Sequence, residues 1–223
     1  MTRTLSHSEA KAFYDRFGAR QDSQRFYEDA AVADLIAHSD MRRARAVFEF
    51  GCGTGRLAAH LLANHLPPAC RYRAVDVSET MVRLARQRLA RWQDRADVAQ
   101  STGSVTLGAE SAGFDRFVVA YVLDLLDTED ISRLLQEAHR ILEPGGLFCA
   151  VALTYGGTLP ARAVSLLWQA LFRLNPKLLG GCRPIVIGDQ LRGAAWSLRH
   201  RNVVTRFGIS SEVVVAVRDH ADT

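Results

Sequence analysis

Lysine is nearly absent from this chain of 223 residues: only Lys11 and Lys177 occur, and arginine supplies the rest of the positive charge. Basic residues number 28 against 24 acidic ones, a formal excess of four. The arginines are spread along the chain, whereas a nucleic-acid-binding surface gathers its basic residues on one face or helix. The composition therefore leads us to expect no nucleic-acid partner.

Cysteine is also scarce, and its spacing excludes two classes of small protein. Cys52, Cys70, Cys149 and Cys182 lie far apart and form no C-x-x-C pair, which excludes a disulfide framework and a zinc ribbon. The first residues lack the apolar segment of a secretory signal. No uninterrupted apolar segment reaches transmembrane length. We expect a cytoplasmic protein with reduced thiols and no bound metal ion.

A glycine-rich turn follows the apolar run Ala46–Phe50, with glycine at Gly51, Gly53 and Gly55. Glycine has no Cβ and tolerates positive φ, so this backbone can turn sharply and approach a ligand closely. The helix expected after the turn would direct free N–H groups at that ligand. One βα unit later an apolar run ends in Asp76, where a carboxylate can accept hydrogen bonds from ribose hydroxyls. The pattern predicts a site for a nucleoside-containing cofactor.

Two residues argue against a dinucleotide in this site. The dinucleotide fingerprint is G-x-G-x-x-G, and Arg56 stands at its third glycine position. Glu49 would repel a pyrophosphate but suits a cationic group such as an ammonium or a sulfonium. A carboxylate within an apolar strand must be compensated. Glu49 therefore either faces the ligand, which the adjoining glycines favour, or pairs with one of the many arginines.

Four segments, in order, resemble the motifs of class I S-adenosylmethionine-dependent methyltransferases. Val47–Gly55 is similar to the first motif and Val75–Met81 to the second. Phe114–Leu123 resembles the fourth strand, which leads to the active site, and His139–Gly146 resembles the turn before the fifth strand. The resemblance covers roughly half of the chain, and within the superfamily it is greatest to the quinone and phospholipid methyltransferase group.

The resemblance implies S-adenosylmethionine as the cofactor. The glycine turn and Glu49, which precedes it, would hold the methionine part of the cofactor. Asp76 would hold the ribose, and Val77 and Met81 would flank the adenine. Many members of the family carry an acidic residue after strand three, which this chain lacks, so Ser104 and the backbone near Val105 would take its place. The implied cofactor-binding residues are Glu49, Gly51, Cys52, Gly53, Gly55, Asp76, Val77, Met81, Ser104 and Ala120.

Candidate catalytic residues are few, because methyl transfer from a sulfonium requires mainly alignment and exclusion of water. A base is needed only when the acceptor loses a proton. Tyr121 would face the methyl group, and Tyr14 and Tyr27 lie on N-terminal helices that could cover it, although each tyrosine could equally serve packing. Asp124 would suit a cationic amine. The Asn/Asp-Pro-Pro-aromatic signature of DNA amino-methyltransferases is missing at Ala120–Leu123, which weakens nucleic bases as acceptors.

Alternating strand and helix patterns predict an α/β fold. We expect a Rossmann-like, seven-stranded, mostly parallel sheet with an antiparallel C-terminal strand and helices on both faces. Strands are predicted at 46–50, 72–77, within 96–107, at 114–121 and at 146–153, followed by a hairpin of 196–207 and 211–217. Helices are predicted at 8–18, 22–38, 55–65, 78–92, 128–142 and 161–174, and the arginines of 83–95 are expected on a solvated helix face.

The whole chain, 1–223, is predicted to form one methyltransferase domain. Residues 1–40 would form a helical lid, 46–155 the cofactor-binding core, 156–195 a substrate-side insertion and 196–217 the C-terminal hairpin. Segment 161–174 is apolar except for a narrow polar stripe that includes Arg162, Ser165 and Arg173. It is either a helix packed on the core or in a dimer interface, the commoner case, or a wall for a lipid-like substrate or a peripheral membrane contact. The oligomeric state stays open.

Taken together, these features predict an S-adenosylmethionine-dependent methyltransferase. Its acceptor would be a small-molecule or lipid-like compound, methylated at O, N or C by in-line displacement. One alternative is a partner protein that binds S-adenosylmethionine without catalysis. An NAD(P)-dependent oxidoreductase is less favoured, because of Arg56.

Overall fold

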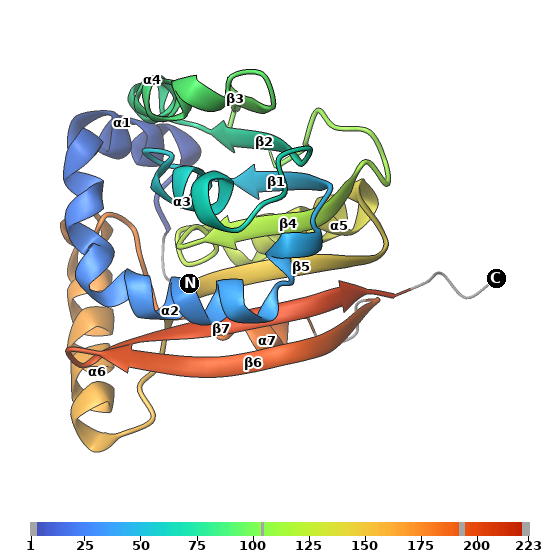
Figure 1. Cartoon of the computed structure of the whole chain (residues 1–223). Helices are drawn as coiled ribbons and strands as arrows, with labels where there is room; N and C mark the ends of the chain where they lie inside the picture. Colours follow the sequence, from blue (N-terminus) through green and yellow to red (C-terminus); the bar gives the residue numbers. More distant parts are fainter. Residues whose placement is uncertain (1–3, 104, 192–194, 220–223) are drawn as a thin grey trace.

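The computed structural model describes residues 4–103, 105–191 and 195–219, in which strands and helices alternate along the chain (Figure 1). The strands are β1 (Ala46–Phe50), β2 (Arg71–Asp76), β3 (Ala96–Gln100), β4 (Phe114–Ala120), β5 (Leu142–Thr154), β6 (Trp196–Arg206) and β7 (Ile209–Arg218). The α-helices are α1 (His7–Phe17), α2 (Arg25–His38), α3 (Arg56–Asn64), α4 (Glu79–Leu89), α5 (Thr128–Ile141), α6 (Leu159–Leu174) and α7 (Ile187–Gln190). Short 3₁₀ helices are η1 (Gly18–Gln24), η2 (Met41–Arg43), η3 (Ala90–Trp92) and η4 (Pro176–Leu179).

Within the described residues, seven strands form one sheet in the order β3-β2-β1-β4-β5-β7-β6. The pairs among β1 to β5 are parallel, and β7 lies antiparallel between β5 and β6. Phe207 and Gly208, which join β6 to β7, both have positive φ, as a tight two-residue hairpin turn requires. The predicted fold class is confirmed.

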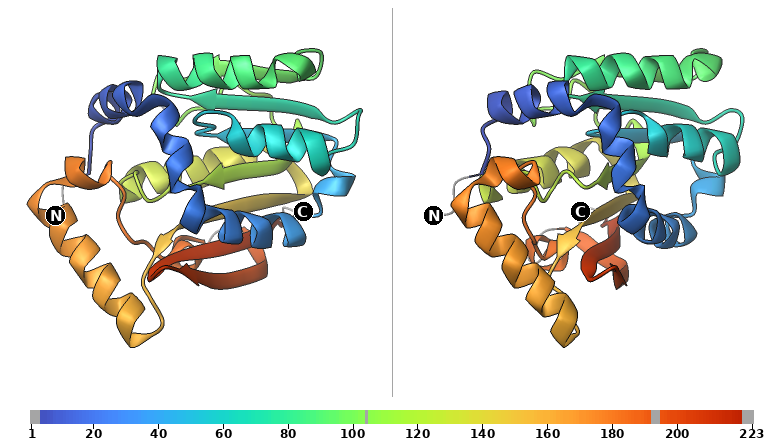
Figure 2. Two further views of the ribbon diagram at one scale, coloured as in Figure 1. Left: turned by 60° about the vertical axis from the view of Figure 1, so that its left-hand side comes forward. Right: turned by 90° about the vertical axis from the view of Figure 1, so that its left-hand side faces the viewer.

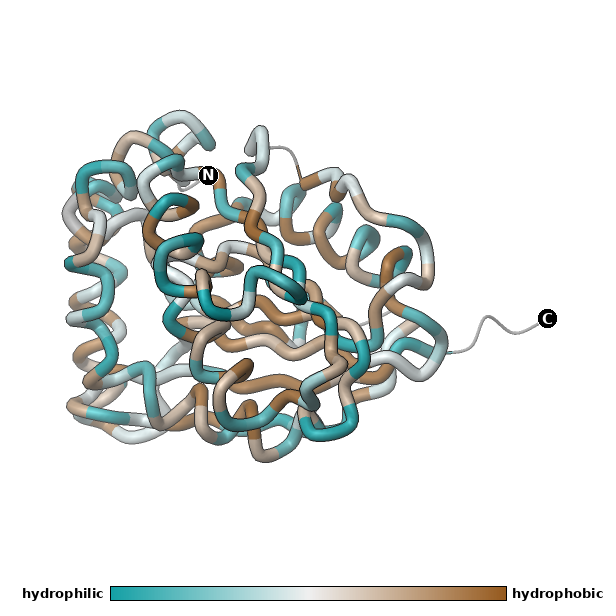
Figure 3. The backbone as a smooth tube through the Cα atoms, turned by 45° about the horizontal axis from the view of Figure 1, so that its top comes forward, coloured by the Kyte–Doolittle hydropathy of each residue, from teal (hydrophilic) through white to brown (hydrophobic). Residues whose placement is uncertain are grey.

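Side chains alternate between the two faces of the sheet, and each face has its own apolar core. On one face Val47 and Val118 pack with residues of α2, α3 and α4. On the other face Phe48 and Phe117 pack with α5 and α7. Figure 3 shows the apolar segments concentrated along the central strands. This two-sided burial is the reason why the strands are almost continuously apolar.

The sequence placed several boundaries wrongly. The helix expected from Asp22 begins at Arg25, because residues 18–24 form the 3₁₀ helix η1. The fifth strand begins at Leu142 rather than at residue 146, since Leu142 pairs with Phe114 before a register shift.

The arginines of 83–95 are not simply a solvated face. Arg88 donates hydrogen bonds to Thr54 and Asp22. Arg95 donates to three backbone carbonyls, of Leu62, Pro67 and Cys70. These arginines therefore tie α4 and the following turn to other elements.

The carboxyl ends of the parallel strands meet at one edge of the sheet, where ligands bind in open α/β folds. The segment α1–η1–α2 crosses this edge, and α6 stands beside it (Figure 2). Among the described residues, no helix is both long and apolar enough to cross a membrane.

Candidate functional site

The glycine turn after β1 is fixed to the neighbouring strand. The N–H groups of Gly51 and Cys52 both donate to the carbonyl of Val75, at 2.8 and 3.1 Å. Gly51 has φ +75°, and a Cβ added there would lie 2.3 Å from a methyl carbon of Val122. Only glycine allows this close approach of β1 to the loop after β4.

Gly55 serves packing rather than ligand contact. A Cβ there would lie 3.0 Å from the backbone of Ala85 on α4. Gly55 lines neither the main cavity, which lies beside Asp76, nor a second cavity beside Glu49. The third glycine of the turn therefore lets α3 and α4 pack closely.

Asp76, the last residue of β2, has its carboxylate oriented by the backbone. One oxygen accepts from the N–H of Gly53 at 2.8 Å, and the other accepts from the N–H of Ser78 at 2.9 Å. Burial raises the pKa of the Asp76 carboxyl, an effect that these two hydrogen bonds oppose. The carboxylate lines the cavity beside the turn and keeps lone pairs free for a further donor.

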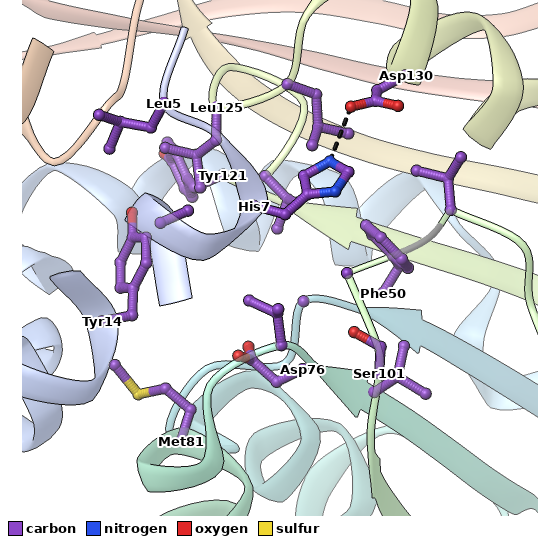
Figure 4. A pocket seen from close by; sticks show the side chains of 18 of the residues that line it. Leu5, His7, Tyr14, Phe50, Asp76, Met81, Ser101, Tyr121, Leu125 and Asp130 are labelled. Carbon is purple, nitrogen blue, oxygen red and sulfur yellow. Dashed lines mark hydrogen bonds and ion pairs between the residues drawn. The ribbon is translucent and has the colours of Figure 1, made fainter. Parts of the chain in front are cut away.

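A main cavity of about 100 Å³ lies between the turn, the loops after β3 and β4, and helix α1 (Figure 4). Its wall includes seven residues predicted from the sequence: Tyr14, Gly51, Asp76, Val77, Met81, Ala120 and Tyr121. Ligand cavities usually measure roughly 300–1,000 Å³. The cavity is smaller than this range, and we therefore expect α1 to move when a nucleoside cofactor binds.

The two ends of this cavity differ in character. Around Asp76 it is lined by Val77, Met81, Ser101 and Gly103. Ser104 lies outside the described residues, and Ser101, three residues before it in the chain, lines the cavity. The opposite end is lined by apolar side chains and two carboxylates, namely Leu5, Val122, Leu125, Leu126, Asp127 and Asp130.

Contacts from the N-terminal segment close the site, and the sequence did not reveal them. Figure 4 shows His7 bonded to Asp130 over the cavity, at 2.8 Å. Asp15 accepts from the Ser78 hydroxyl at 2.6 Å, and Asp22 accepts from the Thr54 hydroxyl at 2.6 Å. The partners in these pairs are 32 to 123 residues apart, so no local pattern indicates them.

Residue Arg56, which departs from the dinucleotide fingerprint, also holds this segment. Its guanidinium bonds Glu28 at 2.8 Å and also bonds Asp29, both on α2. Burial raises the pKa of Glu28 to about 7, and Arg56 opposes that rise. The third position of the motif is therefore occupied by an anchor for the N-terminal helices.

The three candidate tyrosines occupy different environments. Tyr121 has φ +56°, a rare conformation for a non-glycine residue and one often found at functional sites. Its hydroxyl is 2.9 Å from that of Ser211, while its side chain lines both cavities. Tyr14 lines the main cavity, with its hydroxyl 3.5 Å from the carbonyl of Gly180. Tyr27 packs edge-on against Tyr121 and lines neither cavity, so its position is that of a core residue.

Asp124 follows β4 and is completely buried, and neither carboxylate oxygen has a hydrogen-bond partner among the described residues. Burial raises the pKa of this carboxyl to about 7, and the Arg183 guanidinium opposes the rise. Burial, together with the nearby Asp124 carboxyl, raises the pKa values of Tyr14 and Cys182, so both side chains are neutral beside it. An uncompensated buried carboxylate is costly, so this group calls for a functional explanation.

Residues 47–146 match the family model described as a methyltransferase domain. The chain is 26% identical over 151 residues to the tRNA N(3)-methylcytidine methyltransferase Mettl2 of Drosophila melanogaster, covering 63% of this chain and 46% of that protein. It is 29% identical over 108 residues to a demethylmenaquinone methyltransferase of Leptospira interrogans, covering 46% and 40%. The chain thus spans less than half the length of these relatives.

Similarity of fold extends over nearly the whole chain. The structure of the N-methyltransferase NodS of Bradyrhizobium japonicum WM9 with S-adenosyl-L-homocysteine superposes with a TM-score of 0.71. The match is 19% identical in sequence and covers 95% of this chain and 99% of that one. Residues 47–146 thus match a methyltransferase domain, and these comparisons support the class I S-adenosylmethionine-dependent methyltransferase superfamily for this chain. The predicted superfamily and its cofactor, S-adenosylmethionine, are confirmed, whereas the individual binding residues stay predictions.

The residues beside the glycine turn fit the methionine part of this cofactor. A second cavity, lined by Glu49, Gln21 and Cys52, adjoins the turn. Glu49 is 2% exposed and accepts a hydrogen bond from the Tyr72 hydroxyl at 2.8 Å. Burial raises the pKa of Glu49 to about 7. Among the described residues Glu49 forms no ion pair, so the expected alternative of an arginine partner was wrong.

Gln21 is a residue that the sequence did not single out. Its amide oxygen is buried without a hydrogen-bond partner among the described residues. That oxygen lies 2.6 Å from the point where a Cβ on Gly53 would sit. An unpaired acceptor beside a buried carboxylate forms a suitable environment for an ammonium group. These hydrogen-bond acceptors therefore suit the ammonium group of S-adenosylmethionine.

Proposed function

We propose that this protein transfers the methyl group of S-adenosylmethionine to a small, largely apolar acceptor enclosed by the N-terminal segment. The observation that carries the proposal is the far end of the main cavity. There Leu5, Leu125 and Leu126 surround the space opposite Asp76, and the bond between His7 and Asp130 closes it. An enclosed apolar cavity suits a molecule that can be wholly surrounded, such as a quinol-like or lipid-like compound.

The cofactor would be held by the two ends of the glycine turn. Asp76 would accept hydrogen bonds from the ribose hydroxyls. The negative charge of Glu49 would compensate the positive charge of the ammonium group, and the free amide oxygen of Gln21 would accept a hydrogen bond from it. When bound, S-adenosylmethionine supplies a methyl group already activated by the positive sulfonium. The protein then needs to align the acceptor and exclude water, which α1 and the strained Tyr121 accomplish.

Charge at the cavity disfavours a polynucleotide acceptor, although one relative is a tRNA methyltransferase. Asp127 and Asp130 line the acceptor end, and Asp124 is buried nearby. Carboxylates repel the phosphates that a nucleic-acid enzyme must bind.

Asp124 is our candidate for proton transfer from a hydroxyl or amine acceptor. Asp124 itself does not line the cavity, but its chain neighbour Leu125 and its electrostatic neighbour Tyr14 both do. With a pKa of about 7 it can accept a proton at neutral pH. A cationic amine would equally compensate its buried charge, as the sequence suggested.

The test is an assay with radiolabelled S-adenosylmethionine and four acceptor pools: quinols, phospholipids, small amines and bulk tRNA. We expect label in one of the first three pools and none in tRNA, with weaker labelling by the Asp76→Ala variant at a sub-saturating concentration of S-adenosylmethionine. Label in tRNA would overturn the small-molecule proposal. Tight binding of S-adenosylhomocysteine without turnover of any pool would favour the non-catalytic alternative instead.

We place this activity in the cytoplasm. All four cysteines of the chain are free and buried, which agrees with a reducing compartment.

A further inference from the structure

Helix α6 turns an apolar face away from the protein. Its inner side packs against the rest of the protein through three buried residues, Ala161, Ser165 and Phe172. The Ser165 hydroxyl accepts from the N–H of Gly156 and donates to the carbonyl of Ala161. Ser165 is therefore buried, whereas Arg162 and Arg173 of the predicted polar stripe are exposed.

The outer side of α6 carries four strongly exposed leucines. The exposed fractions of Leu159, Leu166, Leu167 and Leu174 are 80%, 64%, 62% and 80%. Their spacing places them on one broad stripe, which the exposed Ala163 and Ala170 complete. An apolar helix face of this size is unusual on a surface exposed to water alone.

Two aromatic rings extend the apolar area at the neighbouring hairpin turn. Phe207 is 78% exposed and Phe26 is 55% exposed, and their ring centroids are 5.6 Å apart. The adjoining residue Gly208 lies against Val164 of α6, because a Cβ on Gly208 would be 3.0 Å from that side chain. The leucine stripe of α6 and these two rings therefore form one surface, which we call the α6 face.

The charged residues of α6 and the charged chain neighbours of Phe26 and Phe207 are all basic, while Asp29, one turn from Phe26 on α2, is paired with Arg56. The chain has no acidic residue between Glu143 and Asp189. Arg162 and Arg173 are exposed on one flank of the stripe, and Arg25 and Arg206 are the exposed chain neighbours of the two phenylalanines. Within the part of the chain that the structure describes, none of these four arginines has a carboxylate partner. An apolar face bordered by unpaired arginines is complementary to a surface of anionic lipid.

We propose that the α6 face docks on an anionic membrane surface, with the leucines and phenylalanines entering the acyl boundary and the arginines meeting the lipid phosphates. Helix α6 stands at the same edge of the sheet as the cofactor site (Figure 2). A lipid-like acceptor would then reach the site from the surface on which the protein sits. The docking itself does not depend on the identity of that acceptor.

A second copy of the chain is a poorer occupant of the same face. A two-fold contact between antiparallel α6 helices would bring Arg162 of one copy beside Arg173 of the other, on one flank. Helix α6 carries no carboxylate that could compensate these like charges. Their repulsion would destabilise the contact between the two helices. Lipid phosphates are negatively charged and would attract the same four arginines.

The test is co-sedimentation of the full chain with vesicles of phosphatidylglycerol and phosphatidylcholine, compared with phosphatidylcholine alone. We expect binding to the anionic vesicles that weakens with salt, and little binding to the neutral ones. The double variant Leu166→Glu/Leu167→Glu should lose the binding. Arg162→Glu/Arg173→Glu should weaken it by at least about 25-fold, the effect of removing two basic residues near an anionic surface.

Matched controls separate docking from misfolding and from general charge. Leu198→Glu replaces a leucine of β6 that is 53% exposed and lies outside the α6 face, and Arg42→Glu/Arg71→Glu makes the same charge change elsewhere. Both controls should bind vesicles nearly as the wild type does, and thermal unfolding should confirm that every variant is folded. The proposal falls if the wild type ignores anionic vesicles or if the two leucine substitutions leave binding intact. It also falls if sedimentation equilibrium finds a dimer that these substitutions dissociate while vesicles remain unbound.

Discussion

The imidazole of His7 lies 2.8 Å from the carboxylate of Asp130, and this bond joins α1 to α5 above the main cavity. The two residues are 123 positions apart in the chain. Both line the cavity, which measures about 100 Å³. This bond, which we call the latch, holds α1 against α5 beside the cavity, and we expect it to open when the cofactor exchanges.

Replacing His7 with alanine should accelerate exchange of S-adenosylhomocysteine. Loss of one hydrogen bond of this kind corresponds to about a two- to tenfold faster dissociation, which stopped-flow displacement can measure. The exposed His60 of α3, far from the cavity, gives the control variant His60→Ala. Equal dissociation rates for His7→Ala and the wild type would mean that the latch does not limit exchange.

Asp76→Ala should weaken binding of S-adenosylmethionine by about five- to thirtyfold, the effect of losing hydrogen bonds to a charged group. Calorimetric titration is the measurement. Asp97→Ala removes an exposed carboxylate from the adjacent strand β3 and should leave affinity unchanged. A folded Asp76→Ala protein with wild-type affinity would refute the assigned role in ribose binding.

Glu49→Gln should raise stability and lower cofactor affinity together. Burial moves the pKa of Glu49 from 4.5 to about 7 in the folded protein, so the folded state binds more protons than the unfolded state between these values. Its contribution to stability therefore declines as pH rises through that window and is least favourable above pH 7. Glutamine can still accept the hydrogen bond from Tyr72 but carries no charge to desolvate.

We expect the melting temperature of Glu49→Gln to exceed that of the wild type by several degrees at pH 8 and to converge with it near pH 4.5. Affinity for S-adenosylmethionine should fall by at least about tenfold, because a compensating charge for the ammonium is lost. Scanning calorimetry and titration give the two readings. Lower stability with unchanged affinity would show that Glu49 serves the fold rather than the ligand.

Asp124→Asn should reduce kcat by about a hundredfold or more if the acceptor loses a proton to this group, while cofactor affinity stays unchanged. In the wild type kcat should rise with pH through about 7, where Asp124 ionises. The variant should lose this pH dependence and become more stable above pH 7, because an unpaired buried charge is removed. A gain in stability with no change in kcat would assign Asp124 a structural position only.

Local sequence determined the fold class and brought together residues that we assign to the cofactor. The run Ala46–Phe50, the glycines that follow it and Asp76 at the end of the next strand act through short-range rules of strand length, turn geometry and strand-end position. These rules predicted where β1, β2, β4 and the hairpin lie, and they brought Gly51, Asp76 and Met81 to one cavity.

Tertiary structure alone decided how that cavity is closed and what surrounds it. The bonds of His7 to Asp130, Asp22 to Thr54, and Arg88 to Asp22 join distant parts of the chain. Gln21 reached the turn in the same way. The sequence likewise assigned Ser165 of α6 to a polar stripe, but packing buried it and turned the leucines outward. Hydrophobic periodicity indicates that a helix has an apolar face, whereas contacts with the rest of the molecule decide which face is covered.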